Sequence, residues 1–378
     1  MKTTILVSPN AFKGSLSSID AARIIQEVLS GIPGSDLICE LAPIADGGDG
    51  TIDVFKFYFQ DSKFVDCVVH DPLMRKIKSK WLLLDDNTAV VELAKASGLS
   101  LLKNDELNPM WANTFGVGEL ILSALDEGCT KIILTLGGSA TVDAGIGILQ
   151  AIGVKVFDKK KKLFKGGGGF LSSIDKIDLN SIDKRLKNCI LNVLCDVKIP
   201  LIGEKGTVQK FSTQKGAKEG EKFILENGMN HFVQITKGYT GVDCATDPMV
   251  GSAGGVAYTL KVFLNAILHP GFLYLSKMIS LENKIKNSDL IITGEGYLDD
   301  QSLMGKATIE LAKLANKYNK KVIVLCGDYD KSIDWRKSGI YSVIQIRPEE
   351  MPVLESLKNT KDLIKTAIEK HSGLFINS

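Results

Sequence analysis

Short apolar segments typical of strands alternate with amphipathic segments typical of helices at both ends of the chain. At the start, a predicted helix at 19–29 stands between predicted strands at 4–8 and 36–42. Near the end, the pattern predicts strands at 288–293, 321–326 and 341–346 and helices at 302–318 and 354–370. Such alternation favours a parallel sheet with helices on both faces, whose ligands bind beyond the carboxyl ends of the strands.

The middle of the chain has a different texture. Residues 67–95 alternate in the manner of strands, and the apolar strand at 131–136 runs into Gly137, where we expect another helix to begin. The chain has 378 residues, which is more than a domain with a single hydrophobic core usually contains. We therefore predict an α/β protein of two domains: residues 1–66 plus 287–378 form a Rossmann- or flavodoxin-like parallel sheet, and residues 67–286 form an inserted α/β domain with a mixed sheet. The active site is expected in the cleft between them.

Charge and composition point to small-molecule chemistry. The chain carries 46 basic and 44 acidic residues, a net charge of +2, which gives no electrostatic footprint for nucleic acid or an anionic membrane. No run of about 18 apolar residues occurs, and the first apolar run is too short for a signal peptide. The seven cysteines form no Cys-x-x-Cys pair. We expect a soluble, cytoplasmic protein with free thiols.

The densest group of polar side chains follows the predicted strand at 288–293. It comprises Glu295, Asp299, Gln301, Ser302 and Lys306. At a strand-to-helix junction the first helical amides lack partners, so a phosphate or carboxylate can bind there while Lys306 neutralises its charge. Alternatively, Ser302 only caps the helix and the neighbouring glycines only serve the turn. Clustered titratable groups favour a site.

A second glycine-rich junction follows the strand at 131–136. It comprises Gly137, Gly138, Ser139, Ala140 and Thr141. Glycines let backbone amides approach an anion, so phosphate is the expected ligand. A tight turn capped by Ser139 or Thr141 is the alternative.

Acids and a lysine follow three other strands. Asp46 and Asp49 lie among glycines that disfavour a helix, so they suit Mg²⁺ bound partly through water and phosphate, or else an ordinary turn. Lys13 follows the first strand and is expected to neutralise an anion. Asp196 follows the apolar run at 190–195 and either accepts a proton from a substrate hydroxyl or caps the next turn.

Common nucleotide and hydrolase motifs are absent. The sequence has no Gly-x-x-x-x-Gly-Lys-Ser/Thr, no Gly-x-Gly-x-x-Gly after the first strand and no Gly-x-Ser-x-Gly. None of the four histidines falls within the polar clusters, so acids and lysines must carry the reaction.

Taken together, these stretches resemble the bacterial type I glycerate kinase family. Its motifs occur here in order, as a Lys-Gly-Ser motif at 13–15, Ala-Asp-Gly-Gly at 45–48, Gly-Gly-Ser-Ala-Thr at 137–141, Cys-Asp-Val at 195–197, Gln-Lys-Gly-Ala at 214–217 and Thr-Gly-Glu-Gly at 293–296. The resemblance implies a two-domain α/β kinase that uses ATP and Mg²⁺ to phosphorylate D-glycerate, commonly to 2-phosphoglycerate. Its partners would be these small molecules, and the protein would be a monomer or homodimer.

The resemblance also suggests residue roles. Gly137 to Thr141 would hold phosphates, and Asp46, Asp49 and Glu295 are candidates for Mg²⁺ or its waters. Lys13, Ser302 and Lys306 would bind the substrate carboxylate or the transferring phosphoryl group, with Asp196 as the base. The candidates for substrate binding are Asn10, Asp299, Gln301 and Ser302.

Two departures from the family pattern bear on the substrate. Asn10-Ala11 stands where the family usually has Asp-Ser, and Tyr297 stands where Arg is common. A kinase for another small hydroxy acid, or a non-catalytic sensor of a sugar acid or nucleotide, therefore remain alternatives. The sequence also leaves open which hydroxyl is phosphorylated, since small shifts in positioning decide it.

Overall fold

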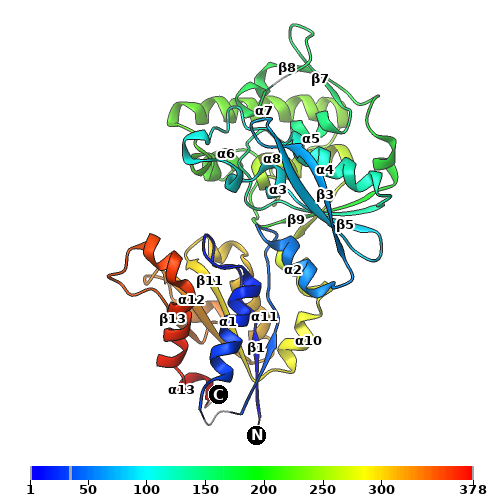
Figure 1. Ribbon diagram of the computed structural model, residues 1–378. Coiled ribbons are helices and arrows are strands. Elements are labelled where there is room, and N and C mark those ends of the chain that lie inside the picture. Colours follow the sequence, from blue (N-terminus) through cyan, green and yellow to red (C-terminus); the bar gives the residue numbers. More distant parts are fainter. Residues whose placement is uncertain (1, 34–35, 165, 377–378) are drawn as a thin grey trace. The chain divides into compact units, whose positions relative to one another are not determined.

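The chain forms two compact units in a computed structural model that describes residues 2–33, 36–164 and 166–376 (Figure 1). The terminal unit comprises Met1–Asp46 and Phe272–Ser378, and the central unit comprises Gly47–Gly271. These bounds differ from the predicted 66/67 and 286/287. Helix α2 (Thr51–Tyr58) packs on strands of the central unit, and α10 (Leu281–Lys286) packs on α11 of the terminal unit.

The terminal unit is built on five parallel strands in the order β13-β12-β11-β1-β2. Their bounds are β1 Thr3–Val7, β2 Leu37–Leu41, β11 Leu290–Leu298, β12 Lys321–Tyr329 and β13 Ser342–Gln345. Numbered along the unit this is the order 2-1-3-4-5, which is flavodoxin-like. The strand order reverses between β1 and β11, so a ligand crevice is expected beyond the carboxyl ends of these two strands.

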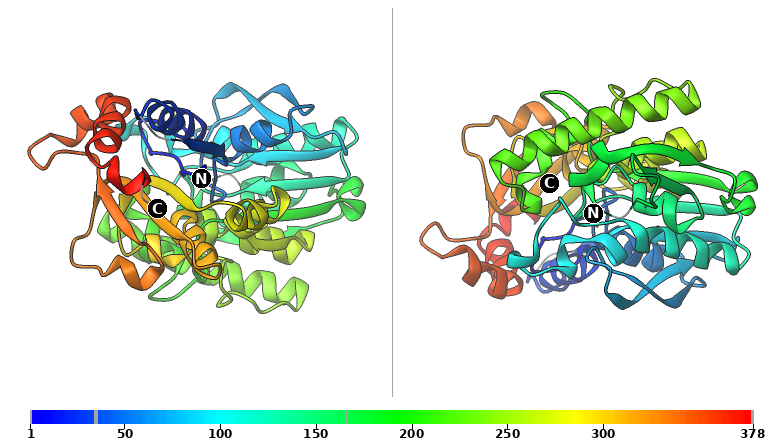
Figure 2. Two further views of the ribbon diagram at one scale, coloured as in Figure 1. Left: turned by 90° about the horizontal axis from the view of Figure 1, so that it is seen from below. Right: turned by 90° about the horizontal axis from the view of Figure 1, so that it is seen from above.

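Helices cover both faces of this sheet. Its helices are α1 Ser18–Ser30, α9 Gly271–Met278, α10, α11 Ala307–Asn316, α12 Val353–Lys370 and α13 Gly373–Ile376, with 3₁₀ turns η6 Ser302–Met304 and η7 Trp335–Ser338. Ile5, Ile292 and Ile323 point to the face that packs on α1, α12 and α13. Alternate residues such as Leu6 and Ile291 are equally buried and point to the opposite face, where α11 lies. Figure 2 shows α1 and α12 side by side although they come from opposite ends of the chain.

Local sequence explains why α1 forms where it does. The Ser17 hydroxyl accepts a hydrogen bond from the backbone N–H of Asp20, which caps the first turn. Ala21, Ile25 and Leu29 then recur at helical spacing and are fully buried. The cap and the apolar stripe together define the helix.

The central unit contains a mixed six-stranded sheet in the order β10-β9-β6-β5-β4-β3. The strands are β3 Lys63–His70, β4 Lys76–Leu83, β5 Thr88–Glu92, β6 Lys131–Thr135, β9 Ile190–Cys195 and β10 Ile267–Pro270, with a separate pair β7 Lys155–Asp158 and β8 Ile174–Asp178. The helices are α2, α3 Ala94–Ser97, α4 Phe115–Asp126, α5 Ile146–Ala151, α6 Thr207–Phe211, α7 Glu219–Thr240 and α8 Ser252–Leu264, with 3₁₀ turns η1 Leu99–Leu101, η2 Asn104–Glu106, η3 Gly168–Ser173, η4 Lys184–Asn188 and η5 Thr213–Lys215. Strands β5, β6, β9 and β10 are parallel, whereas β3 and β4 are antiparallel. The predicted α/β class with one parallel and one mixed sheet is therefore confirmed.

Two predicted helix starts are wrong, and glycines explain both. Residues 302–304 form a 3₁₀ turn, Gly305 adopts φ 111°, and α11 begins only after Lys306. Likewise, Gly137 does not open a helix, because Gly138 has φ 76° and Gly145 has φ 73°, and α5 begins at Ile146. Positive φ values cannot continue a right-handed helix.

None of the seven cysteines is in a disulfide. Within the described residues, no helix is long and apolar enough to cross a membrane.

Candidate active site

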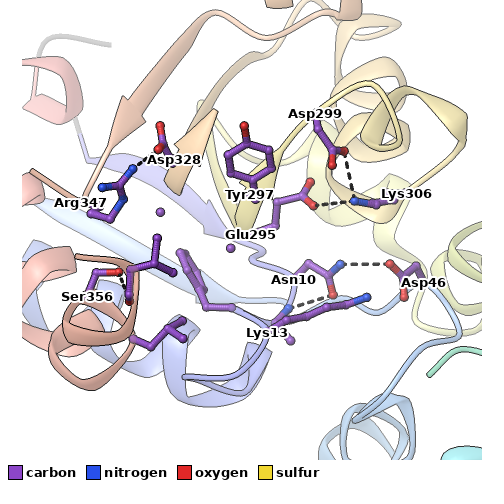
Figure 3. A pocket seen from close by; sticks show the side chains of 16 residues that line it. Asn10, Lys13, Asp46, Glu295, Tyr297, Asp299, Lys306, Asp328, Arg347 and Ser356 are labelled. Carbon is purple, nitrogen blue, oxygen red and sulfur yellow. Dashed lines mark hydrogen bonds and ion pairs between the residues drawn. The ribbon is translucent and has the colours of Figure 1, made fainter. Parts of the chain in front are cut away.

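A pocket of about 420 Å³ lies at the carboxyl ends of the terminal unit's strands. The segments after β1, β2, β11 and β13 contribute to its lining, as do the last residues of β11 and β12. Six of the predicted site residues line it, namely Asn10, Lys13, Asp46, Glu295, Asp299 and Lys306 (Figure 3). The pocket therefore lies where the reversal of strand order places a ligand crevice.

Glu295 is the most perturbed group in the pocket. The residue is only 5% exposed, and its Oε2 lies 3.9 Å from the Nζ atom of Lys306. Burial raises the pKa of Glu295 to about 7, while Lys306, the Thr308 hydroxyl and Lys13 oppose that rise and Asp46 adds to it. The Oε1 atom is buried and makes no hydrogen bond with the residues that the structure describes. A carboxylate held in this way is poised to take up a cation or a proton.

Lys306 links the acids on the β11 side of the pocket. Its Nζ atom lies 3.5 Å from both Asp299 Oδ1 and Ser302 Oγ. The Ser302 N–H donates to Asp299 Oδ1 at 2.9 Å, and the Ser302 hydroxyl accepts from the Asp299 N–H at 3.2 Å. This reciprocal pair fixes the turn, so Ser302 is a buried support for the site and does not line the pocket.

Asn10 and Asp46 form the side of the pocket contributed by the first two strands. The Asn10 Nδ2 donates to Asp46 Oδ2 at 3.3 Å, and the Asn10 N–H donates to the Gly294 carbonyl at 2.8 Å. Figure 3 shows the two side chains directed toward one another. A Cβ on Gly294 would lie 2.9 Å from the Phe12 ring and 2.5 Å from the Leu325 carbonyl oxygen, so the strand end needs glycine there.

The far end of the pocket was not found from the sequence. There Arg347 forms an ion pair with Asp328, and the Arg347 guanidinium also donates to the Met351 carbonyl at 2.8 Å. Phe12, Val353 and Leu357 supply apolar lining. Asp328 and Arg347 each lie at or just after the carboxyl end of a strand. Because ligands bind at the carboxyl ends of parallel strands, a search of every strand end would have identified them.

The remaining predicted residues lie outside this lining. Gln301 is exposed on the surface next to the η6 turn. Asp49, Asp196 and the glycine loop at 137–141 belong to the central unit.

The central unit brings two of the predicted motifs together. The Gly137 N–H donates to the Gly47 carbonyl at 2.9 Å, and a Cβ on Gly137 would lie 2.2 Å from the Cα of Gly48. A Cβ on Gly138 would lie 2.4 Å from the Oδ1 atom of Asp49. Only glycine permits the loop at 137–141 to approach the loop that carries Asp49 this closely.

Side chains beneath the loop fix its shape. The buried carboxylate of Asp143 accepts hydrogen bonds from the Thr114 N–H and hydroxyl and from the N–H groups of Gly145 and Gly147. Burial raises the pKa of Asp143, and the four hydrogen bonds lower it in part. The sequence did not identify Asp143 as important, because its role is the internal support of a loop.

Two further carboxylates of the central unit lie near its predicted loops, those of Asp196 and Glu92. Asp196 is partly buried just after β9, at the strand end where the sequence placed it. The buried carboxylate of Glu92, which the sequence did not single out, accepts from the N–H groups of Gly50 and Ile52 at 3.1 Å and so caps α2. No group of three or more His, Cys, Asp or Glu able to hold a metal occurs among residues 2–33, 36–164 and 166–376.

Comparisons with known proteins agree along nearly the whole chain. Residues 5–375 match the family model described as the Glycerate kinase family. The chain is 38% identical to the glycerate 2-kinase of Escherichia coli over 85% of this chain and 84% of that protein, and 35% identical to a glycerate kinase of Halalkalibacterium halodurans over 96% of each. A crystal structure of a putative glycerate kinase 2 from Salmonella typhimurium LT2 superposes with a TM-score of 0.80 at 32% identity and covers 99% of both chains.

Proposed function

The chain belongs to the glycerate kinase family, and we infer from this membership that it is a kinase that phosphorylates glycerate with ATP as co-substrate. We further propose that D-glycerate is the acceptor and that its 2-hydroxyl is phosphorylated. The name of the Escherichia coli relative, a glycerate 2-kinase, supports this regiochemistry. The enzyme is proposed to act in the cytoplasm, where ATP is supplied, as a monomer or homodimer.

The observation that carries the proposed residue roles is the convergence of acids and lysines in the pocket of the terminal unit. Lys13 and Lys306 border the same cavity as Asp46, Glu295 and Asp299. In phosphoryl transfer, catalysis rests on positioning and on neutralising charge. We propose that the two lysines bind the glycerate carboxylate or the transferring phosphoryl group, and that Asn10 and Asp299 orient the substrate.

Mg²⁺ fits the carboxylates of this pocket. The cation usually binds one or two protein carboxylates and completes its shell with water and substrate phosphates. The buried Oε1 atom of Glu295, which makes no hydrogen bond within the described part of the chain, and the carboxylate of Asp46 provide such ligands in one pocket. When bound, the ion would neutralise the phosphate oxygens of ATP. Asp49, the third predicted ligand, stays a candidate from the central unit.

The remaining steps are assigned to the central unit. We propose that the loop at 137–141 holds phosphates of ATP through its backbone N–H groups and its Ser139 and Thr141 hydroxyls. Asp196 is proposed to accept the proton of the glycerate hydroxyl as that oxygen bonds to the γ-phosphorus and the bond to the ADP oxygen breaks.

Asn10 and Tyr297 are proposed to tune the choice of acceptor. Asn10 donates to Asp46, an interaction that the family's usual Asp would replace by a contact between two carboxylates. Tyr297 is 49% exposed at the pocket and supplies a hydroxyl in place of a fixed charge.

The test is a coupled assay of ADP release with ATP, Mg²⁺ and D-glycerate, on the wild type and on Asp196→Ala and Lys306→Ala. We expect glycerate-dependent release that falls by about 10²-fold or more in each variant. Glu369→Gln, an exposed position on α12, is the control and should keep wild-type activity. Phosphorus and proton NMR of the product identifies the phosphorylated oxygen. ADP release with another short hydroxy acid but not with glycerate would refute glycerate as the acceptor. No ADP release with any of these acids would refute the proposed kinase activity.

A further inference from the structure

Lys215 is a buried lysine that the proposed mechanism does not use. It lies in the η5 turn of the central unit and is only 3% exposed. Its Nζ atom donates to the Thr141 carbonyl at 2.7 Å and to the Ser139 hydroxyl at 3.4 Å. The ammonium group is therefore anchored to two residues of the loop that is proposed to hold phosphates.

The backbone around Lys215 holds it in this place. The next residue, Gly216, adopts φ 97°, and a Cβ there would lie 2.2 Å from the Leu107 carbonyl oxygen. The Lys215 N–H donates to the Ser212 carbonyl at 3.1 Å. The side chain thus starts from a fixed turn and ends under the loop, which leaves it little freedom to leave the interior.

The charge of Lys215 is incompletely compensated within the protein. The negative charges of Asp196 and Asp143 favour its protonated form. Burial outweighs both acids and lowers the pKa of Lys215 to about 8. Its two hydrogen-bond acceptors, a carbonyl and a hydroxyl, are neutral.

A purely structural role would not require a lysine. A neutral amide donor could satisfy the same two acceptors without the cost of burying an ammonium group. A buried cation whose hydrogen-bond acceptors are neutral and which lies under a glycine-rich loop is instead suited to an anion that arrives with the ligand.

We propose that Lys215 is a further phosphate-binding residue, whose ammonium group, together with the Ser139 hydroxyl, is the counter-charge for a phosphate of the nucleotide. The inference rests on the proposed phosphate role of residues 137–141. Because Ser139 receives a hydrogen bond from Lys215 and itself accepts from the Thr141 N–H at 3.1 Å, the lysine also orients the loop.

The experiment compares ATP binding by calorimetry for the wild type, Lys215→Met and Lys210→Met. Methionine keeps the length and apolar stem of lysine and removes the charge. We expect Lys215→Met to weaken ATP binding by about 10- to 100-fold, the loss typical of a charge-assisted contact, while the melting temperature stays the same or rises. Lys210 is exposed on α6, so Lys210→Met should leave both quantities unchanged.

A pH series on the wild type gives a readout that does not depend on a variant. Between pH 8 and pH 9.5 the triphosphate is fully ionised, so loss of the Lys215 proton should weaken ATP binding progressively above pH 8. Lys215→Met should show a flat profile over the same range.

Three outcomes are distinguishable. Wild-type affinity in Lys215→Met, or the same pH profile in wild type and variant, would overturn the inference and leave the proposed function intact. A fall in affinity that Lys215→Gln restores would make Lys215 a structural support and would also overturn it. Failure of the wild type to phosphorylate glycerate, with ATP binding still sensitive to Lys215, would refute the proposed function alone.

Discussion

Replacing Glu295 with glutamine should change how stability depends on pH. The folded protein raises the pKa of Glu295 from 4.5 to about 7, chiefly because the carboxyl group is buried. The folded state therefore holds the proton more tightly than the unfolded state. This contribution to stability is fully present below pH 4.5 and is lost as the pH rises through 7.

The size of the effect follows from the two pKa values. At about 1.4 kcal/mol per pKa unit, the wild type should lose about 2.5 kcal/mol of unfolding free energy between pH 5 and pH 8 through this group alone. Glutamine does not titrate, so Glu295→Gln should lack this term. For a unit of about 150 residues, the difference in melting temperature between variant and wild type should grow by about 5–10 °C across that range.

Thermal unfolding of the wild type, Glu295→Gln and the surface control Glu369→Gln at pH 5, 6, 7 and 8 measures this difference. The control should follow the wild type at every pH. A constant gap between Glu295→Gln and the wild type from pH 5 to pH 8 would refute the reasoning, since it would mean that Glu295 titrates alike in the folded and unfolded protein.

The same group predicts a proton release that reports on Mg²⁺. At pH 7 about half of the Glu295 carboxyls are protonated, and a carboxylate must be ionised to bind a metal. Binding of Mg²⁺ with ATP should therefore release about half a proton per site from the wild type at pH 7 and none through this position in Glu295→Gln. Calorimetry in two buffers of different ionisation enthalpy measures the release, and equal release from both proteins would exclude Glu295 as a ligand.

Three further predictions concern Lys306 in the pocket of the terminal unit and, in the central unit, the loop at 137–141 and its support Asp143. Lys306→Met should lower kcat/KM for glycerate by about 10²-fold, which steady-state kinetics measures. It should also move the pH at which Glu295 stops contributing to stability to a higher value, because Lys306 is the main group that lowers the pKa of that acid; the melting series measures this shift. Gly137→Ala should abolish ATP binding and lower the melting temperature, because its Cβ would overlap the backbone of Gly48. By contrast, a Cβ on Gly220 in α7 would meet none of the described residues within 4 Å, so Gly220→Ala should be neutral or stabilising by up to about 1 kcal/mol. Asp143→Asn should destabilise the central unit by about 2–3 kcal/mol, because an amide turns one of its acceptor oxygens into a donor that faces donors, and denaturant unfolding measures the loss.

Much of the terminal unit could be predicted from sequence because its signals are local. The segment of α1 carries both a cap and a buried stripe, and the strands beside it are short apolar runs. The order 2-1-3-4-5 depends instead on which strands pair across nearly the whole chain, such as Ile5 with Leu290, and a sequence pattern only limits that choice to a family of folds.

The candidate site was predictable where polar residues cluster directly behind a strand, and less so elsewhere. Asp46 and Glu295 stand among glycines, which makes them conspicuous. Arg347 lies in an ordinary polar segment, and Lys215, although it stands in the Gln-Lys-Gly-Ala motif at 214–217, lies among other lysines that are exposed. Their role depends on burial and on contacts with residues far away in the chain, and neither leaves a periodic signal.

The two buried charges have opposite signs and shifts, which indicates how each unit is prepared for its ligand. Burial raises the pKa of Glu295 to about 7 and lowers that of Lys215 to about 8, so in both cases desolvation disfavours the charged form. Each group costs the folded protein stability near neutral pH, and each would be relieved by a ligand of opposite charge. A cation at Glu295 and a phosphate at Lys215 would provide that relief, as Mg²⁺ and ATP would do. Because the same ligands that lower these costs take part in the reaction, binding energy and neutralisation of the transferring phosphoryl group are supplied by the same residues.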